Sequence, residues 1–537
     1  MAEVKAYVRG NETYYPFAYP VPMWTRKWAQ KRADNFALVD LDGGKIYTYK
    51  ELHIRSNILA NSLLAKGVKK GDIVSVILDN CVEFMEIYFA CAKIGAIFTP
   101  LNFRLTPREL KYQVDLTEPS VVIVGQEFAH NVGSLINSGV NFAREDVYCL
   151  RLAGSDKGLP FQDYELLLRD SNSEDPKFDW NIDMEDIQAI MFTSGTTGRA
   201  KACMLSYRKT FYNTINDVME NYYGPFSKFL LSIPLYHSFG LNIITLPILY
   251  IGGIIVMKRG GIEELLETIE REQINTWAGL TVFARMILMV PEVEKKYKLE
   301  HLQGLGLGGE PVPSHLVKTL QQKWPHIVIT SGFGTTETSE ALILPFQDTV
   351  RKAGSCGKAM FYDEVRVVDK DNNDVKTGEV GELLIGGPIM FSGYWRDPKA
   401  TKETIDEQGW WHSGDLVRMD EEGYIYVVER EKDAVISGGE NIYPAEVEEV
   451  ISQHPKVKEV AVIGVPDERW GERPIAIIVP RGEQAVTIEE VRQFCQDKLA
   501  RFKIPDRVEL TDSLPYSGSL KIARWQLKAK YGGGIAR

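Results

Sequence analysis

The stretch TYKELHIRSNILANSLLAKGVKKGDIVSVILDNCVEFMEIYFACAKIGAIFTP, residues 48–100, alternates between two hydrophobic patterns. Residues 49–65 and 81–93 have the length and apolar spacing of helices, whereas 73–78 and 96–100 are short apolar runs typical of buried strands. Strands that alternate with helices in this way predict an α/β layered fold with mostly parallel strands.

The same alternation returns further along the chain and predicts a second α/β layer, with strand and helix segments at residues 252–257, 262–272, 276–279 and 312–324. The longest apolar stretch, residues 241–257, is interrupted by polar residues, a proline and two glycines. We interpret it as a buried helix followed by a strand rather than as a membrane span.

The C-terminal part of the chain has a different texture. Residues 365–368 and 381–385 are short alternating strands around a DNND turn, which predicts a small antiparallel sheet or barrel. Beyond residue 430, helix and strand patterns follow at residues 444–453, 457–465, 474–479 and 488–499. We expect a large N-terminal region, residues 1–430, of two α/β subdomains plus a small β-barrel, hinged to a small mobile α+β domain, residues 431–537.

Bulk composition excludes several classes of protein. The 537 residues exceed one hydrophobic core, and 44% hydrophobic with 25% charged residues is typical of a globular chain. A net charge of -11 argues against a nucleic-acid surface. The six cysteines form no CxxC pair and the N-terminus has no apolar signal region, so we expect a cytoplasmic protein with no membrane span. These properties are compatible with a homodimer but do not indicate one.

The most informative short segment follows the apolar run at residues 189–192 and reads Thr193-Ser194-Gly195-Thr196-Thr197-Gly198-Arg199-Ala200-Lys201. Its glycines let the backbone approach an anion, its hydroxyls and amides donate to phosphate oxygens, and its lysine supplies a mobile positive charge. A polar surface turn is the alternative, but this density of phosphate-binding groups directly after a buried strand favours a polyphosphate site.

This segment resembles the TSGTTGxPKG pattern of the adenylate-forming superfamily, which includes acyl-CoA synthetases, aryl-CoA ligases, luciferases and the adenylation domains of peptide synthetases. The chain departs from the pattern at Ala200 and Ala202, where the family usually has proline and glycine. Further blocks similar to those of the family follow in the family's order, up to about Lys528.

A second segment with residue types that bind anions and metal ions reads Gly332-Phe333-Gly334-Thr335-Thr336-Glu337. It is similar to the family's GYGxTE, with phenylalanine in place of tyrosine. Hydroxyls followed by a carboxylate suit phosphate and a hard cation, although the same pattern is ordinary helix-capping chemistry. The resemblance implies that Thr336 contacts the α-phosphate, that the ring of Phe333 stacks on adenine, and that Thr196 and Glu337 help to hold Mg²⁺.

The resemblance also implies the rest of the ATP and AMP site. Asp415, in a block similar to WxxTGD, accepts hydrogen bonds from the ribose hydroxyls; Arg430, in a block similar to GRxKD, binds ribose or phosphate, and Lys432 is the hinge between the domains. Standing alone, either block could be a surface salt-bridge cluster. The full implied set is Thr193, Ser194, Gly195, Thr196, Thr197, Gly198, Lys201, Gly309, Glu310, Pro311, Phe333, Gly334, Thr335, Thr336, Asp415, Arg430 and Lys521.

Residues 304–309, GLGLGG, contain the GxGxxG spacing of dinucleotide-binding proteins, but the preceding segment, 297–303, is polar rather than strand-like. We expect the glycine run itself to be a strand lining a cavity, which disfavours a nicotinamide-dependent oxidoreductase.

The C-terminal region carries the residues that the resemblance assigns to the thiol step. Gly438, Gly439 and Glu440 lie in a loop similar to the one that forms the pantetheine tunnel of CoA ligases, and Lys521 lies in a block similar to the terminal catalytic-lysine block. Leu520 stands where that block has glycine. The implied catalytic set is Lys201, Thr336, Glu337 and Lys521.

Together these blocks imply an ATP-dependent acid:CoA ligase that forms acyl-CoA, AMP and pyrophosphate through an acyl-adenylate, with Mg²⁺ and with CoA as a substrate. The alternatives are a stand-alone adenylating enzyme that loads a carrier protein, a light-emitting oxygenase and a non-catalytic binding protein of the same fold. The resemblance implies an acid pocket with few charges, suited to a medium-length aliphatic or an aromatic monoacid. The residues it places there are His237, Phe239, Asn242, Gly306, Gly308 and Phe333.

Overall fold

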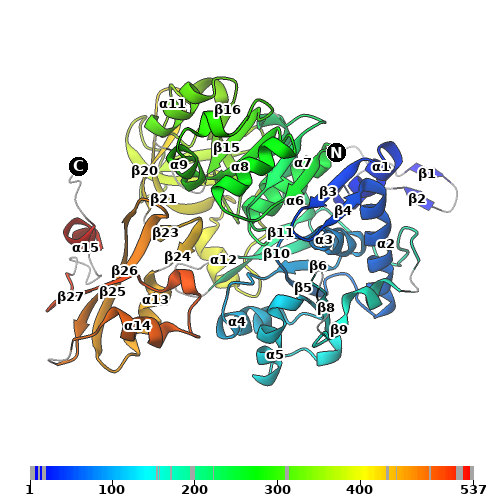
Figure 1. The fold of residues 1–537 in the computed structure, drawn as a ribbon, viewed down its shortest axis with the longest axis horizontal. Helices are drawn as coiled ribbons and strands as arrows, with labels where there is room; N and C mark the ends of the chain where they lie inside the picture. Colours follow the sequence, from blue (N-terminus) through cyan, green and yellow to red (C-terminus); the bar gives the residue numbers. More distant parts are fainter. Residues whose placement is uncertain are drawn as a thin grey trace.

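The computed structural model describes residues 7–9, 12–14, 20–152, 155, 158–169, 172–193, 200–221, 223–308, 312, 314–430, 435–442, 444–482, 485–515 and 524–532. Two large sheets, a smaller antiparallel sheet and a C-terminal sheet account for most of its strands (Figure 1). A short hairpin, β1 (Tyr7–Arg9) and β2 (Glu12–Tyr14), precedes them.

The first large sheet has seven strands in the order β11-β10-β6-β5-β7-β8-β9. Its pairs are parallel except for the antiparallel pair β10 and β11. The strands are β5 (Ile73–Ile77), β6 (Ile97–Pro100), β7 (Val121–Gly125), β8 (Val147–Leu150), β9 (Gln162–Asp163), β10 (Ile187–Thr193) and β11 (Lys201–Ser206). Helices α2 (Tyr49–Ala65), α3 (Val82–Ile94), α4 (Pro107–Thr117) and α5 (Ala129–Asn137) alternate with them, which confirms the predicted first layer.

The second large sheet has nine strands in the order β18-β17-β16-β15-β14-β12-β13-β3-β4, with a parallel centre. They are β3 (Phe36–Asp40), β4 (Lys45–Thr48), β12 (Lys228–Leu231), β13 (Ile254–Met257), β14 (Thr276–Leu280), β15 (Gly304–Gly308), β16 (Val328–Thr335), β17 (Ser339–Leu344) and β18 (Lys358–Ala359). The helices of this part are α1 (Pro20–Lys31), α6 (Tyr207–Glu220), α7 (Leu246–Tyr250), α8 (Ile262–Arg271), α9 (Thr281–Met289), α10 (Val293–Lys296) and α11 (Ser314–Lys323). The glycine run at residues 304–308 is a strand, as predicted.

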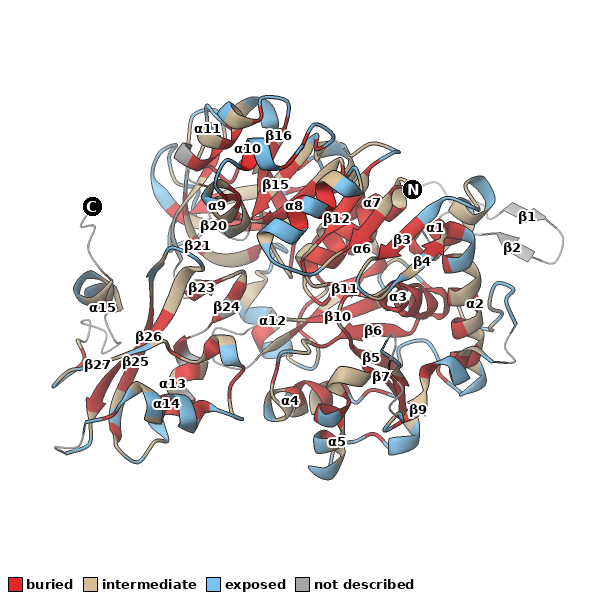
Figure 2. Ribbon diagram, in the orientation of Figure 1, coloured by how far each residue is buried: buried red, intermediate tan, exposed pale blue. Residues whose placement is uncertain are grey.

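Helix α3 lies between the two large sheets and contacts strands of both. Every one of its residues is buried, and Figure 2 shows it red along its length. A helix that is buried on all sides needs apolar residues around its whole circumference, which explains why this segment shows little amphipathic pattern. The apolar stretch at 241–257 is likewise internal: a π-helical segment, Phe239–Thr245, continues into α7 and is followed by β13. No helix of the described residues is both long and apolar enough to cross a membrane.

The region for which a small sheet or barrel was predicted forms a four-stranded antiparallel sheet in the order β19-β20-β21-β22, with helix α12 (Pro398–Thr404) beside it. Its strands are β19 (Glu364–Val368), β20 (Val380–Gly386), β21 (Trp411–Met419) and β22 (Ile425–Arg430). Strand β21 contributes Asp415, whose backbone pairs with that of Arg430 on β22. The sheet thereby places two of the predicted nucleotide-binding residues side by side.

The C-terminal part is a separate sheet of β23 (Val435–Ser437), β24 (Glu440–Ile442), β25 (Val457–Asp467), β26 (Gly471–Pro480) and β27 (Arg507–Leu510), with helices α13 (Pro444–Ser452), α14 (Ile488–Cys495) and α15 (Arg524–Tyr531) (Figure 1). Helix α14 ends four residues before the predicted end at 499, because the backbone is extended at Gln496 and left-handed at Asp497. This confirms a mixed α/β architecture with a distinct C-terminal domain.

Candidate active site

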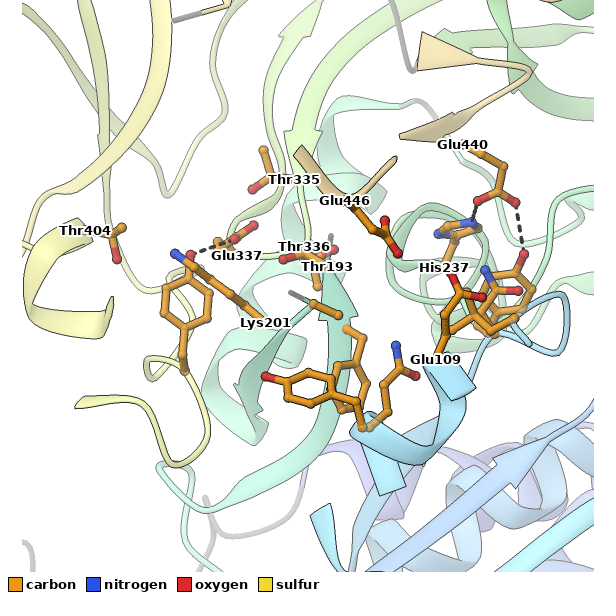
Figure 3. Close-up of a pocket in the computed structure, with 18 of the residues that line it drawn as sticks. Glu109, Thr193, Lys201, His237, Thr335, Thr336, Glu337, Thr404, Glu440 and Glu446 are labelled. Atoms are coloured by element: carbon orange, nitrogen blue, oxygen red, sulfur yellow. Dashed lines mark hydrogen bonds and ion pairs between the residues drawn. The ribbon is translucent and has the colours of Figure 1, made fainter. Parts of the chain in front are cut away.

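The hairpin of β10 and β11 positions the two ends of the phosphate-binding segment. Thr193 and Lys201 are paired across the two strands, so the intervening loop starts and returns at one point of the sheet. Both residues line a cavity of about 990 Å³ (Figure 3). The loop residues Ser194, Gly195, Thr196, Thr197 and Gly198 lie outside the described residues.

A tyrosine connects the predicted phosphate-binding lysine to the predicted metal carboxylate. Lys201 Nζ lies 4.5 Å from the ring centroid of Tyr394, and the hydroxyl of Tyr394 donates a 2.9 Å hydrogen bond to Glu337 Oε1. Burial, and then the negative charge of Glu337, raise the pKa of Tyr394 well above its ordinary value, so the hydroxyl stays a donor. The sequence motifs do not indicate Tyr394, because nothing in its local sequence resembles a motif.

Glu337 lies in the turn between β16 and β17, and only 8% of its surface is exposed. One carboxylate oxygen accepts from Tyr394, and the backbone carbonyl accepts from the amide of Phe391 at 2.9 Å. Thr335 and Thr336 of the same turn line the same cavity (Figure 3). Among the described residues there is no group of three His, Cys, Asp or Glu side chains that could hold a metal by itself. A cation here therefore needs phosphate oxygens besides Glu337, as Mg²⁺ bound to a nucleotide does.

The third sheet closes the same cavity. Asp415 is 3% exposed and lines it, and its amide donates to Ser413 Oγ at 3.0 Å. Nothing beyond the backbone is described for Arg430. Gly309, Glu310, Pro311, Lys432 and Lys521 lie outside the described residues, so their predicted roles stay predictions.

A second cavity, of about 1800 Å³, lies over the glycine strand β15. Gly306, Gly308, His237 and Phe239 line it, as the resemblance implied for the acid pocket. A Cβ added at Gly308 would lie 3.7 Å from Phe239 Cζ, an ordinary contact distance, so no protein atom overlaps that position. The cavity therefore reaches the backbone of the strand at Gly308. Glycines at alternate positions leave one face of β15 without side chains, whereas Leu305 and Leu307 are buried in a hydrophobic cluster.

The other two residues assigned to the acid pocket lie just behind its lining. Phe333 packs against the main hydrophobic core, whereas the flanking Gly332 and Gly334 line the cavity. Asn242 is 3% exposed, and its amide donates to Ser238 Oγ at 3.0 Å. Sequence reasoning missed three polar residues that do line the cavity, Asn221, Tyr223 and Glu340. The cavity as a whole does not meet the expectation of few charges, because Glu340 and several charged residues nearer the C-terminal domain line it, among them Arg104, Arg259, Arg473 and Arg492.

A polar cluster joins the C-terminal domain to the wall between the two cavities. The carboxylate of Glu440 accepts from Arg104 Nη1 at 2.6 Å and from the Tyr236 hydroxyl at 3.1 Å. It also lies 3.1 Å from His237 Nε2, and Figure 3 shows these two side chains facing each other. Burial alone would raise the pKa of Glu440, but the charges and hydrogen bonds of His237 and Arg104 outweigh it and lower the pKa to about 2.

The loop before Glu440 approaches the second cavity closely. Gly438 and Gly439 have φ of +56° and +82°, a conformation that favours glycine. A Cβ at Gly439 would overlap the side chain of Leu280 at the end of β14. Both glycines line the cavity, so the loop assigned to CoA lies at the acid pocket.

A second interdomain contact lies nearby. Lys503 Nζ is 3.0 Å from Glu109 Oε1 on α4 and 2.8 Å from Glu446 Oε1 on α13, and Lys503 is only 6% exposed. Burial raises the pKa of Glu446. Burial lowers the pKa of Lys503, but its two carboxylate partners raise it by more, so the pKa of Lys503 is raised overall. This contact and the Glu440 cluster fix the domains in one relative orientation.

Comparison with known proteins agrees with this geometry. A family model described as AMP-binding enzyme matches residues 25–395, and one described as AMP-binding enzyme C-terminal domain matches residues 446–521. A feruloyl-CoA synthase from Amycolatopsis sp is 35% identical over 492 residues, 91% of this chain and 95% of that protein. An indoleacetate–CoA ligase from Aromatoleum aromaticum is 33% identical over 469 residues, 87% of this chain and 89% of that protein.

Among solved structures, a double mutant of o-succinylbenzoate CoA synthetase from Bacillus subtilis, bound to its product analogue, matches with a TM-score of 0.83 and 27% identity over 96% of this chain and 99% of that one. One family model thus spans most of the chain, and the relatives align along nearly its whole length. The chain belongs to the AMP-binding enzyme family.

Proposed function

We propose that this protein is an aromatic acid:CoA ligase: it activates a monocarboxylic aromatic acid with ATP and Mg²⁺ as the acyl-adenylate, and then transfers the acyl group to the thiol of CoA. The products are the acyl-CoA, AMP and pyrophosphate.

One observation carries the proposal: the nucleotide cavity and the acid cavity share a wall. His237, Gly334, Thr335, Thr336, Gly439 and Glu440 line both of them. An acid whose carboxylate points to this wall would meet the α-phosphate of a nucleotide on the other side. The thiol loop stands at the same place, so both half-reactions can use one position of the acyl carbon.

In the first half-reaction a carboxylate oxygen attacks the α-phosphorus, and the bond to pyrophosphate breaks. The negative charge that develops needs nearby cations and hydrogen-bond donors. Lys201 and the Thr335 and Thr336 hydroxyls line the cavity where the phosphates would lie, and we assign the same role to Lys521.

Mg²⁺ fits the donors that are present. Glu337 Oε1 accepts a hydrogen bond from Tyr394, and Glu337 lines the cavity, so we assign its carboxylate to the cation. Mg²⁺ characteristically takes one or two carboxylates together with substrate phosphates, and when bound it neutralises phosphate charge. Tyr394 orients the carboxylate for that role.

In the second half-reaction the thiolate attacks the acyl carbonyl carbon, the C–O bond to AMP breaks, and AMP leaves. Gly438 and Gly439 line the acid cavity, and their lack of side chains lets the loop pack directly on Trp470 and Leu280, beside the path that we assign to the pantetheine arm. We retain the domain boundary at residues 430/431 with Lys432 as the hinge, because the two half-reactions need different faces of the C-terminal domain. We also propose a cytoplasmic location, where CoA and ATP are available.

Two observations favour an aromatic over an aliphatic acid. The cavity lining includes glycines of β15 and the ring of Phe239, an uncharged surface suited to contact with an aromatic ring. The feruloyl-CoA synthase and the indoleacetate–CoA ligase that align with the chain are both named for aromatic acids.

The proposal is tested with purified protein, ATP, Mg²⁺ and CoA and a panel of benzoic, cinnamic, arylacetic and medium-chain fatty acids. We expect AMP and thioester in equal amounts, with aromatic acids preferred in kcat/KM. Pyrophosphate release without thioester would instead support the alternative that a carrier protein accepts the acyl group. A preference for fatty acids would contradict the aromatic assignment.

A further inference from the structure

The acid cavity contains a carboxylate that the two half-reactions do not use. Glu340 lines the cavity together with Asn221 and Tyr223, and none of the three belongs to the wall shared with the nucleotide cavity. Glu340 keeps some accessible surface, yet burial is the main cause that raises its pKa. The surface that it exposes therefore faces an internal space rather than bulk solvent.

The backbone around Glu340 is built to aim this side chain. A register shift between β16 and β17 follows Phe333, and Ser339 adopts φ of +57°, which is uncommon for a residue other than glycine. Ser339 is fully buried, and Lys209 Nζ donates to its hydroxyl at 2.6 Å. The carboxylate of Glu340 then lies over Gly332, where a Cβ would overlap Glu340 Oε1. Bulges of this kind re-orient side chains next to functional sites.

One neighbour of Glu340 opposes the effect of burial on its carboxyl. Asn221 Nδ2 donates to Glu340 Oε2 at 2.9 Å, and this hydrogen bond lowers the pKa that burial raises. Burial, followed by the charge of Glu340, raises the pKa of Asp217 well above its ordinary value, which reduces the negative charge beside Glu340. Asn221 thus serves the carboxyl from the protein side.

Glu340 has no cation partner among the residues that the structure describes. Lys209, the buried lysine nearby, donates to Ser339 instead, and burial lowers its pKa to about 7. The Tyr223 hydroxyl has no hydrogen bond among the described residues either. A structural ion pair would explain a buried glutamate, but none is present there, and a carboxylate facing a ligand cavity retains acceptor capacity for the ligand.

We propose that Glu340 is a specificity residue that accepts a hydrogen bond from a neutral donor, a phenolic hydroxyl or a ring N–H, on the part of the aromatic acid far from its carboxylate. This inference rests on the proposed function, which places the acid in this cavity. It also predicts that an acid with a second carboxylate is rejected, because two negative charges would meet in a buried site.

The test compares the wild type with Glu340→Gln, which preserves shape and removes the charge, and with Glu340→Leu. The substrates are benzoic and cinnamic acids that carry hydroxyl, amino, methoxy, carboxyl or hydrogen at the 3- or 4-position. We expect the wild type to prefer a hydroxyl over a methoxy acid by about tenfold or more in kcat/KM. Glu340→Gln should shrink that ratio, and Glu340→Leu should abolish it.

A gain of activity distinguishes lost recognition from general damage. Both variants should accept the dicarboxylic acids better than the wild type does, while KM for ATP stays unchanged. Glu300→Gln, an exposed glutamate on the same chain, is the matched control and should leave all ratios as in the wild type.

Failure of this inference is separable from failure of the proposed function. All ratios are measured both as pyrophosphate release and as thioester, so the role of Glu340 is read even if CoA is not the acceptor. Equal hydroxyl-to-methoxy ratios in the wild type and both variants would overturn the inference while leaving the ligase proposal standing. No adenylation of any aromatic acid would overturn both.

Discussion

At the scale of single residues, the site depends on polar side chains that are fixed by a second residue. Glu337 is held by Tyr394, and Glu440 by Arg104, Tyr236 and His237. A buried carboxylate that keeps its charge needs such donors, because an unpaired buried charge is very costly. The partners come from distant parts of the chain, which is why the sequence motifs indicated the carboxylates and His237 but not Tyr394, Arg104 or Tyr236.

The hydrogen bond between Glu337 and Tyr394 predicts a large loss of adenylation rate when Glu337 is replaced and a smaller one when Tyr394 is replaced. Glu337→Gln should lower the adenylation rate on the order of a hundredfold and raise the Mg²⁺ concentration needed for half-maximal rate. Tyr394→Phe leaves the carboxylate but removes its donor, so we expect a smaller loss, about tenfold. Pyrophosphate exchange across a Mg²⁺ titration measures both. An unchanged Mg²⁺ dependence in Glu337→Gln would exclude a metal role for this residue.

A buried carboxyl predicts a pH effect on stability. Burial raises the pKa of Asp363 to about 8, with Lys209 lowering it and Glu340 and Glu220 raising it. A raised folded pKa means that the contribution of Asp363 to stability is full below about pH 4 and is lost as the pH rises towards about 8. Asp363→Asn should therefore increase Tm relative to the wild type more at pH 8 than at pH 5. Thermal unfolding at both pH values checks this, and an equal change at both would contradict it.

At the scale of elements, the glycine strand β15 shapes the acid pocket, and its side-chain-free surface predicts a size effect. A Cβ at Gly308 meets only ordinary contacts, so Gly308→Ala should be tolerated. Gly308→Trp should fill the cavity, raise KM for the acid and shift selectivity towards smaller acids, while KM for ATP stays nearly unchanged. Steady-state kinetics with acids of increasing size measure this. A loss of ATP affinity with unaltered acid preference would place Gly308 at the nucleotide instead.

The elements were largely predictable from sequence because their patterns are local. Residues 49–65 form α2 within the predicted bounds, and the run at 304–308 forms a strand. The acid pocket was only partly predictable. Glu340 was missed because its direction depends on a bulge and on the left-handed backbone of Ser339, and neither leaves a mark in the local sequence. Asn242 and Phe333 were selected by resemblance, which does not show whether a side chain points into the cavity or behind its wall.

At the scale of the whole molecule, function depends on how the C-terminal domain sits on the N-terminal region. Two contacts hold the orientation seen here, the Glu440 cluster and the bridge from Lys503 to Glu109 and Glu446. This orientation presents the Gly438–Gly439 loop to the acid cavity. Under the proposed function we assign this orientation to the thiol-transfer step and expect the adenylation step to use another one.

The last prediction separates the two half-reactions by domain orientation. Glu440→Gln and Lys503→Met each remove a buried partner from the contacts that hold this orientation. Each should therefore slow thioester formation from a supplied acyl-adenylate by about tenfold or more. Pyrophosphate release from acid and ATP should stay unchanged or become faster. Because the pKa of Glu440 is lowered to about 2, its contribution is present above its ordinary pKa and is lost only as the pH falls towards 2. The thiol-transfer defect of Glu440→Gln should therefore be measurable throughout about pH 6 to 9, because Arg104 keeps its charge over that range. Lys521→Ala is the converse control: it should abolish adenylation on the order of a hundredfold or more and spare transfer from the supplied adenylate. Equal impairment of both half-reactions by Glu440→Gln or by Lys503→Met would show that these contacts stabilise the fold rather than select one orientation.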